Sequence, residues 1–161
     1  MDEVNKLSTE LHNSVFGDPW HGASVEEILT EINVEQAFHK PITSAHNIME
    51  LTLHLTAWTE EVLSRFESNP PALPKIGDWP IPADRTEEYW TELKQNFFQV
   101  TLKLIAAIKS FTEAELDKIV GTERNTAIGT GFSYSGLILG LVQHNAYHAG
   151  QISLIKKTFA Q

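Results

Sequence analysis

Two histidines near the C-terminus, His144 and His148, have the spacing of a metal-chelating pair on a helix. Residues four apart lie one above the other on the same helix face, about 5 to 6 Å apart between their Cβ atoms, so both imidazoles can reach one ion. An isolated pair of this kind is also compatible with two core histidines satisfied by hydrogen bonds. The pair interrupts an apolar stripe whose other members are Leu137, Leu141, Ile152 and Ile155.

A third histidine, His54, lies at the edge of another apolar stripe, beside Leu55 and Trp58. His54 and His144 each follow the expected start of their helix by about ten residues, so each is roughly 15 Å along its helix axis. If the second and fourth long helices run parallel, the three imidazoles reach the same level. Three neutral imidazoles in an apolar core would need three separate partners, whereas one shared ion satisfies them all. The sequence therefore predicts a divalent metal site at His54, His144 and His148.

Three histidine ligands with an open fourth position are typical of a catalytic zinc-type site. Imidazole ligands also suit nickel, copper and iron, so the metal is not fixed by the ligands alone. Glu50 precedes His54 by one helical turn. It could orient a ligand imidazole, act as a general base, or ligate the ion, and otherwise it is a solvated glutamate at the edge of the stripe. Glu50 is the candidate catalytic residue.

Three further residues have two interpretations each. Tyr147 and Gln151 are three residues from His144 and His148, so either they line the pocket or they pack within the bundle. His21 lies in a turn that could fold over the mouth of a bundle, or it is a surface histidine. His46 is eight residues before His54, which places it about 80° round the helix and makes it a poor companion ligand.

The elements that must position these side chains are helical. Apolar residues recur at spacings of three and four in four long segments, which we expect to be helices. They are residues 4–15, a segment capped by Thr43 or Ser44 and ending at 66, residues 87–108 capped by Thr86, and a segment from the cap Ser133 or Ser135 to about 158. Shorter helices are expected at 25–32, capped by Ser24, and after a capping box at Thr112.

Two segments have loop composition. Residues 68–85 contain five of the seven prolines, which neither continue a helix nor pair well in a sheet. Residues 121–131 are rich in glycine, threonine and asparagine and alternate poorly between apolar and polar residues, so we expect a loop that can include an extended stretch. The pattern as a whole predicts an all-α fold, an up-down four-helix bundle with short connecting helices, in a single domain of residues 1–161.

The acidic net charge and the absence of cysteine disfavour some classes of function. The net charge of −9 disfavours binding to nucleic-acid phosphates, which depends on clustered lysine and arginine. The chain begins without a signal-peptide pattern, and its longest nearly apolar run, residues 136–142, is too short to cross a bilayer. We therefore expect a cytoplasmic protein without membrane or nucleic-acid partners. Because the chain has no cysteine, any thiol chemistry must use a substrate thiol.

The segment from His144 to Ile152 resembles the last-helix signature of DinB-like (YfiT-like) proteins, and residues 45–58 are similar to their second-helix motif. Residues 20–22 and the Asp78–Pro80 segment also resemble members of this family. The resemblance implies a four-helix bundle that dimerises and binds one divalent metal, most often nickel or zinc, with iron or manganese as alternatives, through the three matching histidines. Asn145 departs from the pattern, since many relatives have an acidic residue there.

The resemblance implies a metal-dependent hydrolase or a transferase that uses a low-molecular-weight thiol, acting on a small-molecule substrate. The alternative is a non-catalytic metal-binding module of a stress response. A fourth metal position that is open favours the enzyme, and one filled by a side chain such as Glu50 favours the module. A DNA-binding role fits the acidic charge poorly.

Overall fold

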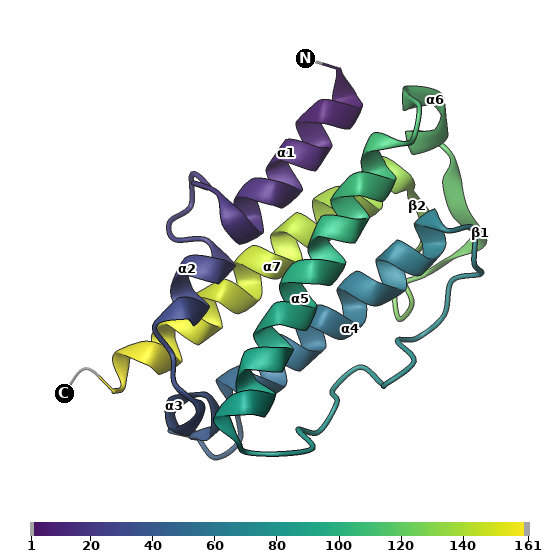
Figure 1. The fold of residues 1–161 in the computed structure, drawn as a ribbon. Helices are drawn as coiled ribbons and strands as arrows, with labels where there is room; N and C mark the ends of the chain where they lie inside the picture. The colour runs from purple at the N-terminus through teal and green to yellow at the C-terminus, as the bar shows by residue number, and fades with distance from the viewer. Residues whose placement is uncertain (1, 160–161) are drawn as a thin grey trace.

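Helices dominate residues 2–159, the part of the chain that the computed structural model describes, and a small two-stranded sheet completes the fold (Figure 1). The mainly helical prediction is confirmed, whereas the prediction of a fold without strands is wrong. In chain order the elements are α1 (Glu3–Phe16), α2 (Val25–Thr30), α3 (Val34–Phe38), α4 (Ile48–Phe66), α5 (Glu87–Lys109), α6 (Glu113–Leu116), β1 (Ile119–Asn125), β2 (Thr130–Ser133) and α7 (Tyr134–Lys157).

Side-chain caps fix where the helices begin. The predicted caps Ser24, Thr86 and Ser133 each accept a hydrogen bond from a backbone N–H in the first turn of their helix, and Thr112 forms the predicted capping box. The predicted start of α4 at Thr43 or Ser44 is wrong. Its cap is Asn47, because a reciprocal capping box with Glu50 satisfies two backbone N–H groups there. The short helix α3 was not predicted.

The four long helices pack in a closed ring, in which α4 contacts α5 and α7, and α1 contacts the same two helices. The starts of α4 and α5 both lie beside α3. Asn47 at the start of α4 donates to the carbonyl oxygen of Phe38, and Glu87 at the start of α5 accepts from the backbone N–H of Val34. Helices α4 and α5 therefore run in the same direction, opposite to α1 and α7 (Figure 1).

This arrangement corrects the expected up-down order, in which consecutive long helices alternate in direction. Residues 67–86 run back along the length of the molecule, so α5 starts at the same end as α4 (Figure 1). As a result α4 and α7 are antiparallel rather than parallel. Their shared end is marked by the Tyr134 hydroxyl, which donates to the carbonyl oxygen of Arg65. His54 and His144 lie at similar distances from that end, so they still meet.

The core consists of two clusters of buried apolar side chains, one toward α2 and α3 and one toward α6. Most of the predicted stripe positions, such as Leu55, Leu104 and Ile152, are buried in them. Trp90 is completely buried, and its indole N–H donates to the carbonyl oxygen of Ile32 at 2.7 Å. That hydrogen bond ties the first turn of α5 to the segment between α2 and α3.

The segment predicted to be a loop, residues 121–131, forms most of an antiparallel hairpin in which Val120 pairs with Phe132. Nearly all of β1 is exposed, so it lacks the apolar alternation that marks a half-buried strand. Gly131 has a φ of +78°, and a Cβ there would lie 2.8 Å from the Cα of Arg124, so the hairpin needs glycine at this position.

Arg65 on α4 holds the turn of the hairpin. Its guanidinium donates to the carbonyl oxygens of Ile128 at 2.6 Å and Gly129 at 3.1 Å, and its Nε donates to the carboxylate of Glu61 at 3.0 Å. The Arg65 side chain is only 2% exposed and that of Glu61 6%. The buried arginine is therefore neutralised by the carboxylate and satisfies two carbonyl groups of the turn.

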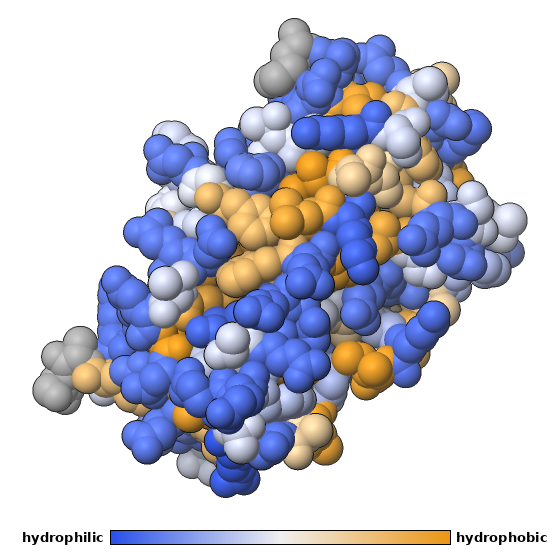
Figure 2. Space-filling model, in the orientation of Figure 1, coloured by the Kyte–Doolittle hydropathy of each residue, from blue (hydrophilic) through white to orange (hydrophobic). Residues whose placement is uncertain are grey.

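Hydrophilic side chains cover most of the face shown in Figure 2. On the face seen in Figure 2, apolar side chains gather in a band between α1 and α5, with hydrophilic side chains around it. Among residues 2–159, none of the helices combines the length and the apolar character that a bilayer span requires.

Replacing Arg65 with alanine should destabilise the protein by roughly 3 to 5 kcal/mol, because it leaves the buried Glu61 carboxylate without its partner. Urea unfolding monitored by circular dichroism measures the change. Arg85→Ala, which removes an exposed arginine stacked on Phe38, is the control and should cost less than about 1 kcal/mol. Equal costs for the two variants would contradict the role assigned to Arg65.

Candidate metal centre

The three predicted ligands meet between α4 and α7. The Nε2 atom of His54 lies 2.9 Å from Nε2 of His144, which in turn lies 3.1 Å from Nε2 of His148. Ligand atoms of the three side chains all lie within 4.8 Å of one another, and His54 and His148 are buried. No aspartate, glutamate or further histidine of residues 2–159 belongs to this group. The histidines thus form a cluster that can hold a metal ion.

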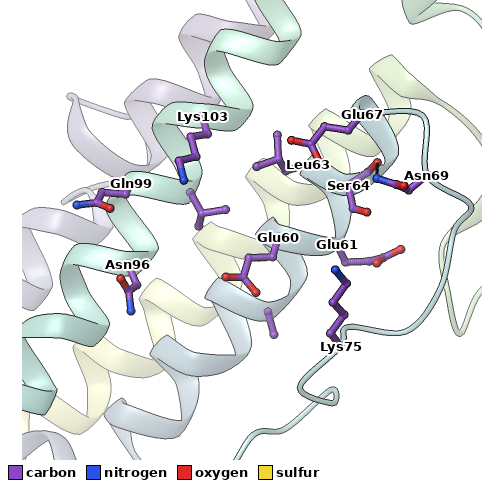
Figure 3. A pocket seen from close by; sticks show the side chains of 12 residues that line it. Glu60, Glu61, Leu63, Ser64, Glu67, Asn69, Lys75, Asn96, Gln99 and Lys103 are labelled. Atoms are coloured by element: carbon purple, nitrogen blue, oxygen red, sulfur yellow. Dashed lines mark hydrogen bonds between the residues drawn. The ribbon is translucent and has the colours of Figure 1, made fainter.

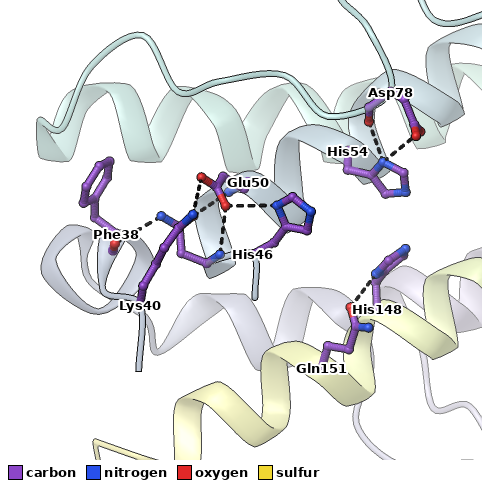
Figure 4. Close-up of polar contacts among 9 residues, drawn as sticks. Phe38, Lys40, His46, Glu50, His54, Asp78, His148 and Gln151 are labelled. Atoms are coloured by element: carbon purple, nitrogen blue, oxygen red, sulfur yellow. Dashed lines mark hydrogen bonds and ion pairs between the residues drawn. The ribbon is translucent and has the colours of Figure 1, made fainter. Parts of the chain in front are cut away.

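Two of the imidazoles are oriented by hydrogen bonds from their other ring nitrogen (Figure 4). Nδ1 of His54 lies 2.6 Å from the carbonyl oxygen of Asp78, which can only accept, so this nitrogen carries the proton. Nδ1 of His148 lies 2.7 Å from the side-chain oxygen of Gln151 and donates to it in the same way. Both rings therefore present an unprotonated Nε2, the form that binds a metal.

The resulting tautomers create a conflict that a cation resolves. The Nε2 lone pairs of His54 and His148 both face Nε2 of His144, which can donate a proton to only one of them. At least one of these two acceptors is then left without a donor. A divalent ion at the common point accepts all three lone pairs. Nitrogens at a tetrahedral zinc are about 3.3 Å apart, close to the 2.9 and 3.1 Å that separate Nε2 of His144 from those of His54 and His148.

Burial keeps the imidazoles neutral. It lowers the pKa of His144 to about 3, and the neighbouring His148 and His54 contribute to the same shift. Burial also lowers the pKa of His54, against the opposing effect of the hydrogen bond to the Asp78 backbone, and lowers the pKa of His148 against the opposing effect of Gln151. At neutral pH all three side chains are in the uncharged form that a metal requires.

Residues 78 and 79 close one side of the cluster. The indole ring of Trp79 is stacked between two imidazoles, with its centroid 3.6 Å from that of His46 and 3.9 Å from that of His54. The Asp78 carboxylate accepts from the indole N–H of Trp58 at 2.6 Å. The sequence predicts a loop here and assigns it no role beyond the resemblance of the Asp78–Pro80 segment to DinB-like proteins. Neither periodicity nor spacing marks these two residues, because they reach the site by the return of residues 67–86 along the molecule.

Glu50, the candidate catalytic residue, is engaged elsewhere (Figure 4). Its carboxylate accepts the backbone N–H of Asn47, pairs with Lys40 at 3.0 Å and lies 3.1 Å from Nδ1 of His46. Burial raises the pKa of Glu50, but the hydrogen bonds from Lys40, Asn47 and His46 outweigh it and lower the pKa overall. The carboxylate is not part of the histidine cluster, and its catalytic role stays a prediction.

The remaining residues considered from the sequence have separate places. Gln151 orients His148, whereas Tyr147 is exposed and meets the His148 ring edge to face. Asn145 is buried and faces α1, where it donates to the Ser14 hydroxyl, so it does not orient a ligand. His21 is exposed and lies outside the cluster.

Two pockets differ in their relation to the cluster. The pocket in Figure 3 lies between α4 and α5, has a volume of about 490 Å³ and is lined by polar side chains such as Glu60, Lys75 and Lys103. None of the three histidines lines it. A second pocket of about 690 Å³ includes His144 in its wall. The second pocket is therefore the one that adjoins the candidate metal centre.

A sequence model of the DinB superfamily matches residues 20–152. The chain belongs to the DinB superfamily. The match includes the three histidines, Glu50 and the Asp78–Pro80 segment, and it confirms the resemblance found in the sequence at the level of the superfamily. No curated protein and no solved structure matches the chain. The three-histidine cluster of this DinB superfamily member is compatible with a metal site.

The untagged protein should bind about one divalent ion per chain. His54→Ala, His144→Ala and His148→Ala should each reduce the bound metal sharply, since two imidazoles alone bind a metal much more weakly than three. Elemental analysis after dialysis measures the content. His46→Ala, which removes a neighbouring histidine outside the cluster, is the control and should keep the ion. Unchanged metal content in all three ligand variants would refute the site.

The metal-free protein should lose stability as the pH falls from 7 to 5. The histidines of the unfolded chain take up protons near pH 6.5, whereas the lowered pKa values of the cluster keep its histidines neutral. Below that pH the unfolded state therefore binds more protons than the folded state, and the free energy of unfolding decreases as the pH decreases. Thermal melts in the presence of a chelator measure this dependence. His144→Gln should flatten it, and an equally steep dependence in that variant would contradict the pKa shifts.

Proposed function

We propose that this DinB superfamily member is a metal-dependent enzyme that transfers a low-molecular-weight thiol to a small electrophile. One observation carries the proposal: three imidazole acceptors converge on one point, and no carboxylate of residues 2–159 joins them. Such a site leaves a coordination position for an exogenous ligand. The chain has no cysteine, so the thiol must come from outside.

The ion that we propose is zinc or nickel, with iron and manganese as alternatives. Imidazole suits zinc and nickel well, whereas manganese prefers oxygen ligands. A divalent ion supplies Lewis acidity, which lowers the pKa of a thiol or water molecule that binds beside the histidines. The thiol would lose its proton to solvent and its sulfur would form a bond to the electrophilic carbon, while the bond from that carbon to its leaving group, such as a halide, breaks and the leaving group departs to solvent with the bonding electron pair.

The residues of the chain orient and shield this centre. The backbone of Asp78 and the side chain of Gln151 hold the rings of His54 and His148 with Nε2 directed at the common point. The ring of Trp79 covers one face of His54 and keeps water away from it. These contacts position the ligands before an ion or a substrate binds, which reduces the ordering that binding requires.

Metal-dependent hydrolysis is the second candidate. Water is a weaker nucleophile than a thiolate and benefits from a general base. Glu50 is the base that the sequence predicts, and its carboxylate is already bound by Lys40 and His46. The Asp78 carboxylate lies 3.4 Å from Nδ1 of His54, on the outer side of that ring, and accepts from the indole N–H of Trp58. These contacts favour the thiol route, in which no base of the protein is needed.

The non-catalytic alternative is a metal-binding module of a stress response. It requires a fourth ligand from the protein, and the contacts of Glu50 with Lys40 and His46 disfavour that residue as the ligand.

We also propose that the four long helices form the four-helix bundle of the family and that the protein is a homodimer. Its cytoplasmic location and its lack of nucleic-acid partners stay predictions.

Metal-loaded protein screened with pairs of small thiols and electrophiles should show thiol consumption that His144→Ala abolishes. Glu50→Gln should reduce the thiol reaction by less than about threefold, whereas a reaction that relies on Glu50 as general base should fall about 100-fold or more. Loss of free thiol, followed with a chromogenic reagent, measures the first reaction, and ester and amide hydrolysis measure the second. Activity that persists in His144→Ala would contradict the proposal.

A further inference from the structure

We propose that the 690 Å³ pocket beside His144 binds an uncharged apolar group of the substrate, so that this protein prefers electrophiles or thiols with an aromatic or branched aliphatic group. This inference rests on the proposed function, because the substrate must reach the ion held by His144. The volume lies within the range of about 300 to 1,000 Å³ that is usual for small-molecule sites.

The walls of the pocket come from three elements that are far apart in the sequence. Helix α4 contributes Trp58 and Val62, the hairpin contributes Ile128 and Phe132, and α7 contributes Leu137 and Leu141. His144 follows Leu141 on α7 and is part of the same wall. A molecule that lies in the pocket therefore has apolar contacts along its length and a metal ligand at its side.

Two aromatic walls are held by contacts outside the pocket. The indole N–H of Trp58 donates to the Asp78 carboxylate, and the guanidinium of Arg124 lies 3.6 Å from the ring centroid of Phe132. Because Asp78 also binds His54 through its backbone, one residue connects the pocket wall to the metal centre. Fixed aromatic surfaces favour flat or branched apolar groups, since binding then costs little ordering of the protein.

The charge in the lining favours an uncharged occupant. Arg65 is the lining residue that carries a full charge at neutral pH, and it is committed to Glu61 and to the carbonyl oxygens of Ile128 and Gly129. A carboxylate or phosphate group would have to compete with Glu61 for it. An apolar group displaces water from the walls without disturbing this network.

Gly140 provides open space next to the metal ligand. It lines the pocket four residues before His144, hence on the same face of α7, and no atom lies within 4 Å of where its Cβ would be. Gly150 on the same helix also has no atom within 4 Å of the Cβ position but does not line the pocket. Leucine at either position should be accepted by the helix, and only leucine at position 140 should fill the pocket.

The test uses cobalt-substituted protein and two thiols of similar acidity, benzyl mercaptan and 2-mercaptoethanol. Changes in the cobalt absorption spectrum report thiol binding at the ion and give both affinities. We expect benzyl mercaptan to bind at least about tenfold more tightly in the wild type, because its ring leaves water for the pocket. In Gly140→Leu the ratio of the two affinities should fall toward one, whereas Gly150→Leu should keep the wild-type ratio.

Each outcome distinguishes the two proposals. A ratio that is already near one in the wild type, or that Gly140→Leu leaves unchanged, overturns the pocket inference and leaves the metal-dependent thiol chemistry intact. If neither thiol changes the cobalt spectrum, the proposed function fails and the inference fails with it.

Size-exclusion chromatography of the variants adds a further outcome. If Gly140→Leu separates a dimer that Gly150→Leu retains, a second copy of the chain covers the pocket, and the inference is overturned.

Discussion

Three imidazole nitrogens whose lone pairs meet at one point are the constraint on which the rest of the site depends. The hydrogen-bond acceptors on the outer nitrogens of His54 and His148 fix the tautomers of these two rings. Their inner nitrogens therefore only accept, and His144 can donate a proton to one of them but not to both. Protonation of a second ring nitrogen does not resolve the conflict, since burial lowers the pKa of each ring and keeps it neutral. A divalent cation would remove the conflict by accepting all three lone pairs. The local structure around the cluster is therefore compatible with a metal site.

The antiparallel contact of α4 and α7 and the long return of residues 67–86 serve the same site. The return allows α4 and α5 to run in one direction, and it carries Asp78 and Trp79 to the cluster. Asp78 uses its backbone to orient His54 and its side chain to fix Trp58, a wall of the adjoining pocket. The pocket wall and the histidine cluster are thus connected through residues 67–86, a segment without regular secondary structure.

The sequence predicts the clustering of the three histidines because helical periodicity is local. His144 and His148 are one turn apart on a strongly periodic segment, and His54 lies on the apolar stripe of another. Helix direction depends on the path of a proline-rich segment, which periodicity does not specify, so the expected parallel pairing was wrong although the histidines still meet. The sequence pattern does not predict the hairpin, because β1 is almost wholly exposed and lacks the apolar alternation of a half-buried strand. The role expected for Glu50 rests on its spacing from His54 and on the second-helix motif. Neither reveals that Lys40, His46 and Asn47 surround its carboxylate.

The coordination sphere of the metal-loaded, untagged protein tests the account most directly. X-ray absorption at the metal edge, together with anomalous diffraction from crystals, identifies the ligand atoms and their distances. The account predicts three imidazole nitrogens at about 2.0 to 2.1 Å and one exogenous ligand, which a small thiol replaces with sulfur at about 2.3 Å. A fourth ligand supplied by Glu50 or another side chain of the protein, with no change on addition of thiol, would contradict it.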